Sequence, residues 1–334
     1  MWRLTSCAVT GRRHKISNEL CQDIVNVTRI GNVDIIALAD GAGSASRSRI
    51  GAQLSVDAAI SYIATNWEDL YNDTDASSVK KKLLEHILSS LNECCEEVSC
   101  SIDDLASTLL VVAIRGDNFL LFHIGDGVIG YLRNNTVRVA SYPSNGEFVN
   151  TTVFITSKNA ISAIHAYKGV LDESVSGFVL MSDGTCESLF EKRNKKFSSG
   201  IKRIMQWNIV LPKDHIDSSL DKSFKEHVIK RTNDDCSIAV ISRETKYLRG
   251  YFNMTYKQKF ELLGMDGNHK SKVVRHRIKR YDSIMRLLVC PLTLREIAKK
   301  ISLDPTYLRK SYMDILCDCG LVNIKDGHYY SLLY

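Results

Sequence analysis

No run of apolar residues in this 334-residue sequence is long enough to cross a bilayer. A membrane-spanning helix needs about 18 or more such residues, and the longest run, Leu105 to Ile114, contains Ser107 and Thr108. The opening Met-Trp-Arg-Leu-Thr-Ser also lacks the apolar segment that follows the basic residue of a secretory signal peptide. We therefore expect a cytoplasmic protein with no membrane partner.

The ten cysteines lack the repeated C-x₂-C pairs of a zinc site. Cys7, Cys236 and Cys290 lie in apolar stretches, where a free thiol packs as a small hydrophobic side chain. We therefore expect free, reduced cysteines, and a zinc or disulfide role is the alternative.

An excess of charge of one sign is found only near the C-terminal end of the sequence. The net charge is +6, and the segment from Gly250 to Tyr334 holds 15 of the 44 basic residues but only 8 of the 38 acidic ones. The remainder of the chain is close to neutral. Such asymmetry indicates two modules with different partners.

Short apolar runs bounded by turn residues predict β-strands along the first 245 residues. Amphipathic patterns predict long helices at Ile50 to Trp67 and Val79 to Val98, and Gly11 to His14 is predicted to form a turn. Polar turns such as Gly116-Asp117-Asn118 indicate antiparallel hairpins, so we expect an α+β fold of stacked sheets covered by helices. The predicted strands are Leu4 to Val9, Ile24 to Val27, Val33 to Ala39, Thr108 to Arg115, Phe119 to Ile124, Gly127 to Arg133, Thr136 to Ala140, Gly177 to Met181 and Cys236 to Ile241.

A compact series of helix signals follows near the C-terminal end of the sequence. The basic amphipathic segment Val273 to Leu288 predicts one helix, and Thr293 with Glu296 forms a capping box that starts a second. Asp304 caps a third helix whose first residue is Pro305, and this helix should run to Leu316 and end at Gly320.

Two short apolar runs then flank Asp326-Gly327, which predicts a β-hairpin. Helix, turn, helix and hairpin in this order predict a winged-helix domain. The chain is therefore expected to hold one large domain over residues 1–245, a connection over 246–270 and a winged helix over 271–334.

Five aspartates lie at the ends of the apolar runs: Asp23, Asp40, Asp126, Asp183 and Asp234. A strand end holds its carboxylate on rigid backbone, and a following glycine allows a sharp turn and close backbone approach. Glycine follows three of the five. Carboxylates repeated in this way suit a hard divalent cation, Mg²⁺ or Mn²⁺.

The arrangement resembles the type 2C metal-dependent serine/threonine protein phosphatases, the PPM family, in their bacterial branch. The resemblance covers roughly residues 1–243 and implies a four-layer α-β-β-α sandwich of two antiparallel sheets. The motifs, in family order, are Gln22-Asp23, Ala39-Asp40-Gly41-Ala42-Gly43-Ser44, Ala106-Ser107-Thr108-Leu109, Ile124-Gly125-Asp126-Gly127, Met181-Ser182-Asp183-Gly184 and Asn233-Asp234-Asp235.

The same resemblance implies a dinuclear Mn²⁺ or Mg²⁺ site. Asp40 would bridge two ions and the carbonyl of Gly41 would bind one of them. Asp183 and Asp234 would complete the shell of the other ion, and Asp23 would act on the first directly or through water. In bacterial members an acidic residue at the position of Asp126 holds a weaker third ion together with that of Asp183.

In this family a hydroxide bridging the two ions attacks phosphoserine or phosphothreonine. His14 and Arg13 lie where the family carries residues that contact phosphate, and His14 could also protonate the leaving group. Arg12 is a further candidate for phosphate contact at the same place, and the alternative for Arg12 and Arg13 is that both are solvated turn residues. Ser107 and Thr108 are either hydrogen-bonding groups near the metals or ordinary strand residues. No covalent phosphoenzyme is implied, so Cys21 and Cys186 need not be nucleophiles.

Three departures from the family pattern concern the same site. Gln22 replaces the usual glutamate, Ala42 stands where eukaryotic members have histidine, and Gly127-Val128 replaces Ser-Arg after Asp126. All three resemble bacterial variation, and every core aspartate is present. The basic segment from Glu187 to Ser199 follows Asp183 where the family carries a flap, and it is either a phosphopeptide-attracting flap or a solvated loop.

We therefore expect a protein-serine/threonine phosphatase whose substrate is a phosphoprotein of a cognate kinase. The winged helix would recruit a partner or regulate the enzyme, and either DNA or protein would suit its exposed Thr306, Tyr307, Arg309 and Lys310. For DNA, Lys299, Lys300 and the cluster from Arg275 to Arg280 would add further contacts. The third interpretation is that the winged helix is a purely structural appendage. The competing function is that of a DNA-binding regulator whose phosphatase-like domain senses phosphoprotein without turnover.

Overall fold

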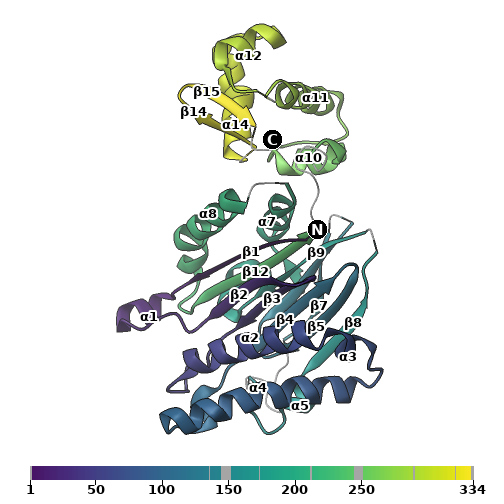
Figure 1. Cartoon of the computed structure of the whole chain (residues 1–334). Coiled ribbons are helices and arrows are strands. Elements are labelled where there is room, and N and C mark those ends of the chain that lie inside the picture. The colour runs from purple at the N-terminus through teal and green to yellow at the C-terminus, as the bar shows by residue number, and fades with distance from the viewer. Residues whose placement is uncertain are drawn as a thin grey trace. The chain divides into compact units, whose positions relative to one another are not determined.

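A computed structural model describes residues 2–134, 136–143, 152–172, 174–210, 213–243, 251–288, 290–319 and 321–331. The chain forms two compact units (Figure 1). The first unit comprises residues 1–205 and 217–243, and the second comprises 206–216 and 244–334. Among the described residues no helix is both long and apolar enough to span a membrane.

The first unit is built on two five-stranded antiparallel sheets. One sheet has the order β2 (Ile24–Ile30), β3 (Val33–Ala39), β4 (Leu109–Arg115), β5 (Asn118–Ile124), β8 (His165–Val170). The other has the order β1 (Trp2–Val9), β12 (Cys236–Arg243), β9 (Val175–Met181), β6 (Val128–Arg133), β7 (Thr136–Ser141).

Side chains of β3 show how the layers hold together. Every residue of this strand is buried. Ile36 and Leu38 pack between the sheets, in one cluster with Phe178 and Leu180 of β9. Ile35 points to the opposite face and packs in the cluster that includes the helices. Because successive residues of a strand point to opposite faces, β3 contributes to both apolar layers.

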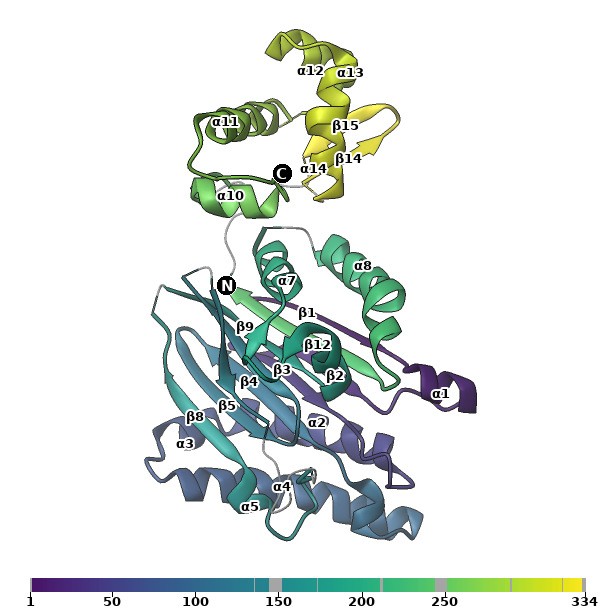
Figure 2. The same cartoon turned by 180° about the vertical axis from the view of Figure 1, so that it is seen from behind.

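Helices complete the four layers. The outer face of the β2–β8 sheet is covered by α2 (Ser48–Thr65), α3 (Trp67–Asn72) and α4 (Ala76–Val98) (Figure 1). The other sheet carries α6 (Asp183–Leu189) and those parts of α7 (Ser199–Val210) and α8 (Lys213–Ser223) that belong to the first unit (Figure 2). The predicted fold of two antiparallel sheets flanked by helices is thus confirmed.

The nine predicted strands are present, with bounds that differ by up to three residues. The elements that differ from prediction include a helix and a strand. Residues predicted as a turn, Gly11 to His14, lead into helix α1 (Arg12–Ser17), which ends at Asn18 in a left-handed conformation. Strand β8 was not predicted, because His-Ala-Tyr-Lys-Gly-Val is neither apolar nor regularly alternating and only its pairing with β5 makes it a strand.

All ten cysteines are free thiols. Cys7 and Cys236 are buried, as expected from their apolar neighbours. The expectation for Cys290 was wrong, because it is exposed. It lies in a bend beyond the end of a helix, where the preceding Leu288 takes the inward position.

The second unit is largely helical. It contains α10 (Tyr256–Leu262), α11 (Lys272–Leu287), α12 (Leu294–Ile301), α13 (Pro305–Leu308), η4 (Arg309–Met313) and α14 (Asp314–Asp318). A small sheet of order β13-β15-β14 joins β13 (Leu292–Thr293), β15 (His328–Ser331) and β14 (Val322–Lys325). Its apolar core includes Ile278, Tyr281, Ile284, Ile297, Leu308 and Leu316.

Local signals predicted this unit well. The capping box of Thr293 with Glu296 is present, and Asp304 caps the helix that starts at Pro305. Asp326 and Gly327 both have positive φ, 51° and 76°, as a two-residue hairpin turn requires. Of the predicted connection, residues 246–250 lie outside the described residues, and its later part contains α10.

The predicted helix from Pro305 to Leu316 is present but contains a turn of π-helix at η4. The carbonyl of Ser311 in this turn accepts hydrogen bonds from Arg277 Nη2 and the Tyr281 hydroxyl, both at 3.1 Å. Donors on α11 therefore satisfy a backbone group inside the wider turn. The predicted end of the helix at Gly320 lies outside the described residues.

We expect Gly51→Ala to destabilise the first unit. A Cβ atom at Gly51 of α2 would lie 1.9 Å from the carbonyl oxygen of Leu105, a backbone atom that cannot swing aside. The free energy of unfolding in urea should decrease by about 3 kcal/mol. The control Gln53→Ala, on the exposed side of the same helix, should change it by less than about 0.5 kcal/mol. Equal effects would contradict the packing argument.

Candidate metal centre

A cavity of about 240 Å³ lies in the first unit among the ends of the strands that carry the predicted aspartates. Its lining includes four of the five, Asp40, Asp126, Asp183 and Asp234. Gly41 and the predicted phosphate-contacting pair, Arg13 and His14, line the same cavity. The fold therefore gathers residues that are far apart in the sequence.

Strand direction explains this convergence. Asp40, Asp126 and Asp183 follow the carboxyl ends of β3, β5 and β9, whereas Asp23 and Asp234 precede β2 and β12. All five are thus at strand ends, but two are at the amino ends.

Antiparallel pairing brings the two kinds of end together. Ile24 pairs with Ala39, so Asp23 and Asp40 extend from the same edge of one sheet. In the other sheet Ile238 of β12 pairs with Met181 of β9, which places Asp234 on the side of Asp183.

The glycines after three of these aspartates allow close approach of backbone segments. A Cβ atom at Gly127 would lie 2.6 Å from the carbonyl oxygen of Met181, and one at Gly184 would lie 2.1 Å from that of Asp235. Their φ angles are not positive, so no left-handed turn is needed there. Gly125 differs, because its φ is +117° and a Cβ would meet Thr108 at 2.5 Å.

Three carboxylates are close enough to share a cation. One oxygen each from Asp40, Asp126 and Asp183 lie within 4.8 Å of one another. Neighbours fix these groups: the Thr152 hydroxyl donates to Asp126 Oδ2 at 2.6 Å, and the backbone N–H of Gly184 donates to Asp183 Oδ1 at 2.5 Å. The Asp40 backbone N–H donates to Thr108 Oγ1 at 2.9 Å.

Crowding of like charge perturbs these carboxyl groups. Burial raises the pKa of Asp40 well above its usual range, and the charges of Asp23 and Asp183 raise it further. Burial also raises the pKa of Asp183 to about 6, with a further contribution from Asp126. A bound cation would offset both the desolvation and the repulsion.

Asp23 lies beside this group, outside the cavity lining. It is 2% exposed, and neither carboxylate oxygen has a hydrogen-bond partner of good geometry. Burial raises its pKa to about 7, although the hydroxyl groups of Ser237 and Ser182 lower it somewhat. Buried carboxylate oxygens without partners are what an all-oxygen cation site would leave, so the residues present fit a divalent cation such as Mn²⁺ or Mg²⁺.

Helix α1 presents the two basic candidates. The backbone N–H of Arg13 donates to the carbonyl of Asn233 at 3.0 Å, which fixes α1 to the segment before β12. The His14 side chain is nearly buried, with Nδ1 3.0 Å from Asp235 Oδ2 and Nε2 3.5 Å from Glu19 Oε2. Arg12 donates instead to the carbonyl of Thr232 at 2.8 Å and does not line the cavity.

Asp235 is a residue of this site that sequence reasoning missed. Its carboxylate accepts the backbone N–H groups of Gly11 and Gln22, each at 2.5 Å, besides contacting His14. The signal was present, because Asp235 follows Asp234 directly and consecutive residues of extended backbone point to opposite sides. Thr152 and Phe154, which also line the cavity, carried no sequence signal.

Other predicted neighbours have structural partners. Ser107 shares a hydrogen bond with Ser55 of α2 at 3.2 Å and does not line the cavity. Burial raises the pKa of the Cys21 and Cys186 thiols far above the neutral range. Both therefore stay protonated and are poor nucleophiles.

The basic segment after Asp183 forms a small hairpin. Strands β10 (Phe190–Glu191) and β11 (Lys196–Phe197) pair, and the residues between them, which include Lys192, Arg193 and Lys195, are exposed. Lys195 Nζ lies 4.4 Å from the centre of the Tyr142 ring. This segment is thus an ordered cationic hairpin.

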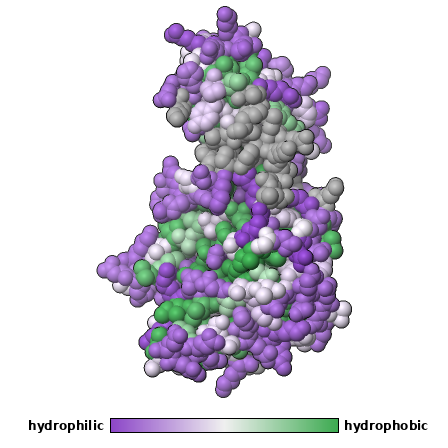
Figure 3. Space-filling model, viewed as in Figure 1, coloured by the Kyte–Doolittle hydropathy of each residue, from purple (hydrophilic) through white to green (hydrophobic). Residues whose placement is uncertain are grey.

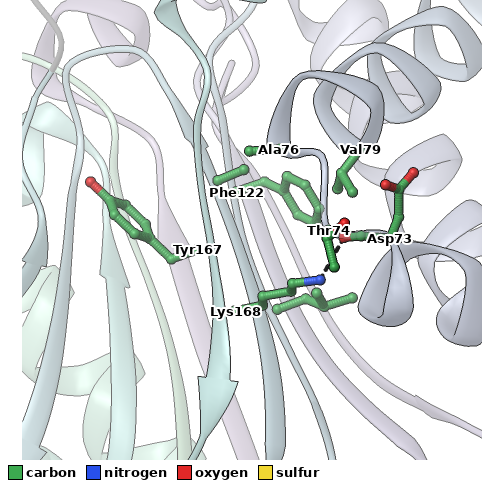
Figure 4. A pocket seen from close by; sticks show the side chains of 9 residues that line it. Asp73, Thr74, Ala76, Val79, Phe122, Tyr167 and Lys168 are labelled. Carbon is green, nitrogen blue, oxygen red and sulfur yellow. Dashed lines mark hydrogen bonds between the residues drawn. The ribbon is translucent and has the colours of Figure 1, made fainter.

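A second cavity of the first unit, at the start of α4, has a different character (Figure 4). Its volume is about 60 Å³, whereas small-molecule sites are usually about 300–1,000 Å³. Lys168 Nζ donates to the carbonyl oxygens of Tyr71 and Asp73 at 2.5 and 2.6 Å, so this cation serves to close the loop. We assign this cavity no function.

The raised pKa values in the carboxylate cluster predict how the free energy of unfolding depends on pH when no metal is bound. Asp23 and Asp183 have pKa values of about 7 and about 6 in the folded protein, above the value of about 3.9 for an exposed aspartate. The folded state thus binds protons more tightly, and the resulting stabilisation is lost as pH rises from about 4 to about 7.

Urea unfolding in EDTA should therefore give a lower free energy of unfolding at about pH 8 than at about pH 5. Asp23→Asn should reduce this difference, whereas Asp57→Asn, an exposed change on α2, should not. Excess Mn²⁺ should reverse the loss at high pH. A pH-independent stability in EDTA would contradict the assignment of a repulsive cluster.

Comparison with known proteins agrees with this geometry. The sequence model of the protein phosphatase 2C family matches residues 10–224. The serine/threonine-protein phosphatase 3 of Escherichia coli K12 is 27% identical over 174 residues, which cover 50% of this chain and 67% of that protein.

Solved structures show the same fold. A bacterial serine phosphatase superposes with a TM-score of 0.54 at 12% identity, over 74% of this chain and 100% of its own. The serine/threonine phosphatase Stp1 of Staphylococcus aureus gives 0.52 at 13% identity, over 73% and 96%. Since the family model matches more than half of the sequence and includes all its predicted aspartates except Asp234, the chain belongs to the protein phosphatase 2C family of serine/threonine phosphatases.

Proposed function

We propose that the first unit hydrolyses phosphoserine and phosphothreonine in proteins, using two Mn²⁺ or Mg²⁺ ions held by the aspartate cluster. The observation that carries the proposal is the approach of three carboxylate oxygens, within 4.8 Å of one another, in a cavity that also presents Arg13 and His14. Carboxylates alone would repel a phosphate, so a cation and basic side chains are both needed.

In this proposal each carboxylate has the role that the family resemblance implies. Asp40 and the Gly41 carbonyl would hold the first ion, Asp183 and Asp234 the second, and Asp23 would act from its buried position beside Asp40. Asp126, with Asp183, would hold a weaker third ion. When bound, such ions supply activated water near neutral pH and offset negative charge on the phosphoryl oxygens.

The chain's own groups then handle the substrate. Arg13 would orient the phosphate through its guanidinium, which matches phosphate oxygens in a bidentate manner. His14, whose Nδ1 lies 3.0 Å from Asp235 Oδ2, would pass a proton to the leaving serine or threonine oxygen. The substrate is proposed to be a phosphoprotein of a serine/threonine kinase.

We infer that the second unit contains a winged helix over residues 271–334, and that a connection over 246–270 joins it to a catalytic domain over 1–245. The order α11, β13, α12, α13 to α14, β14, β15 supports this, as does the sheet in which β15 pairs with both β13 and β14. The unit would recruit a partner to the phosphatase or regulate it.

The direct test is hydrolysis by the purified chain. Phosphothreonine peptide and p-nitrophenyl phosphate should both be hydrolysed with Mn²⁺ and not in EDTA. Asp40→Asn should lower kcat by about 1,000-fold or more and should also abolish the Mn²⁺-induced rise in melting temperature. Asp57→Asn is the matched control. Failure of the native chain to hydrolyse either compound would favour a phosphoprotein sensor without turnover.

Asp235 should behave differently from its neighbour Asp234, although the two are adjacent. Asp235→Asn should lower kcat/KM by about 10–100-fold, because the amide nitrogen cannot accept from one of the two backbone N–H groups, those of Gly11 and Gln22, and because the negative charge beside His14 is lost. Its Mn²⁺-induced rise in melting temperature should persist, whereas Asp234→Asn should diminish that rise. Loss of the rise in both variants would instead make Asp235 a metal ligand or a purely structural residue.

A further inference from the structure

The positive charge of the second unit is concentrated on α11 rather than on the helix expected to read DNA. Residues 272–287 contain six lysines and arginines and one acidic residue, Asp282. The segment from Asp304 to Asp318 contains Arg309 and Lys310 against three aspartates. Arg309 Nε also lies 3.6 Å from a carboxylate oxygen of Asp314 in that segment.

Four of the cations on α11 form one stripe. Lys272, Arg275, Lys279 and Arg286 are all exposed, and their spacing of three, four and seven residues places them on one face of an α-helix. At a rise of 1.5 Å per residue the stripe extends about 21 Å. The opposite face of the helix packs into the core of the unit through Val274, Ile278, Tyr281, Ile284 and Met285.

Among the described residues, no acidic side chain forms an ion pair with a member of the stripe. Asp282 is held by Lys259, whose Nζ lies 2.8 and 2.9 Å from the two carboxylate oxygens. Arg286 lies over the ring of Phe252 at 4.4 Å, and Arg275 lies over that of Tyr256 at 5.9 Å. Aromatic rings thus hold two of the cations without consuming their charge.

Apolar anchoring is nearly missing from the same helix. Val273 is the one large hydrophobic side chain exposed on α11, every residue of which the structure describes. Protein interfaces are depleted of lysine and depend on apolar or aromatic anchors. A regular row of cations without such anchors suits an extended polyanion better.

We propose that the α11 stripe, Lys272, Arg275, Lys279 and Arg286, binds the phosphate backbone of a nucleic-acid duplex without reading its sequence. The phosphatase would thereby be held on nucleic acid by electrostatic contacts that release counterions. The helix from Pro305 to Asp318 would contribute little, since it carries only Arg309 and Lys310 against three aspartates in the same segment, and Arg309 lies near Asp314. The proposal does not depend on the chemistry of the first unit.

The test uses the full chain and a fluorescent duplex of about 30 base pairs and random sequence, titrated by anisotropy from about 50 to about 200 mM salt. The native chain should bind, with little dependence on sequence. Lys272→Gln with Lys279→Gln should weaken binding by about tenfold at low salt and should reduce the slope of log K against log salt by about 2. In the part of the chain that the structure describes, neither lysine lies over an aromatic ring, so their loss should not unfold the unit.

The matched control, Lys299→Gln with Lys300→Gln, makes the same charge change at two exposed lysines of α12 and should leave both quantities nearly unchanged. Both double variants should retain Mn²⁺-dependent hydrolysis of p-nitrophenyl phosphate, which separates this test from that of the phosphatase. Comparing DNA with RNA duplexes will show which the stripe prefers.

Several results would overturn the proposal. The native chain could fail to bind, the two double variants could weaken binding equally, or Arg309→Gln with Lys310→Gln could cause the larger loss. Polyglutamate that displaces the duplex at equal charge concentration would instead identify an acidic protein as the partner.

Discussion

Repulsion among carboxylates at one edge of two stacked sheets is the constraint on which the first unit depends. Asp40, Asp126 and Asp183 approach within 4.8 Å, and Asp23 is buried beside them. Such an arrangement is unfavourable without a counter-charge. It can persist only on backbone that is fixed elsewhere, and β3, buried along its whole length between two apolar layers, supplies that rigidity. The core therefore holds the site in a conformation that the site alone would oppose.

Asp235 connects the carboxylate cluster to the helix α1, which carries Arg13 and His14. Its carboxylate accepts backbone N–H groups from both sides of α1 and contacts His14. Asp234, the preceding residue, lines the cavity from the same backbone segment. One extended segment thus places Asp234 at the cavity, and it places Asp235 beside His14 and the backbone on both sides of α1.

The sequence predicted the parts of the structure that depend on local signals. Strands such as Val33–Ala39, the capping box at Thr293 and the turn at Asp326 follow from short patterns, and the structure confirms them. Elements that exist only through distant pairing were missed: β8 needs β5, α1 needs the segment before β12, and the π-turn of η4 needs donors from α11. The cavity contains all but one of the predicted aspartates. The contacts of Asp235 could not be predicted from the sequence, because they depend on which backbone N–H groups lie near its carboxylate. The individual ligand roles remain predictions.

The two charged clusters of this chain differ in how far they are buried, and this difference indicates which kind of ligand each would bind. Asp23 is buried, with carboxylate oxygens that have no hydrogen-bond partner among the described residues, and burial raises the pKa of Asp40 and Asp183. A small, hard cation would suit such a place. The cations of α11 are exposed on an open helix face, and the one acidic residue of that helix is already paired with Lys259. These exposed side chains are hydrated in the free protein, and their spacing suits repeated charges on a polymer more than a single ion. The difference in solvation, more than the sign of the charge, therefore distinguishes a metal centre from a polyanion surface.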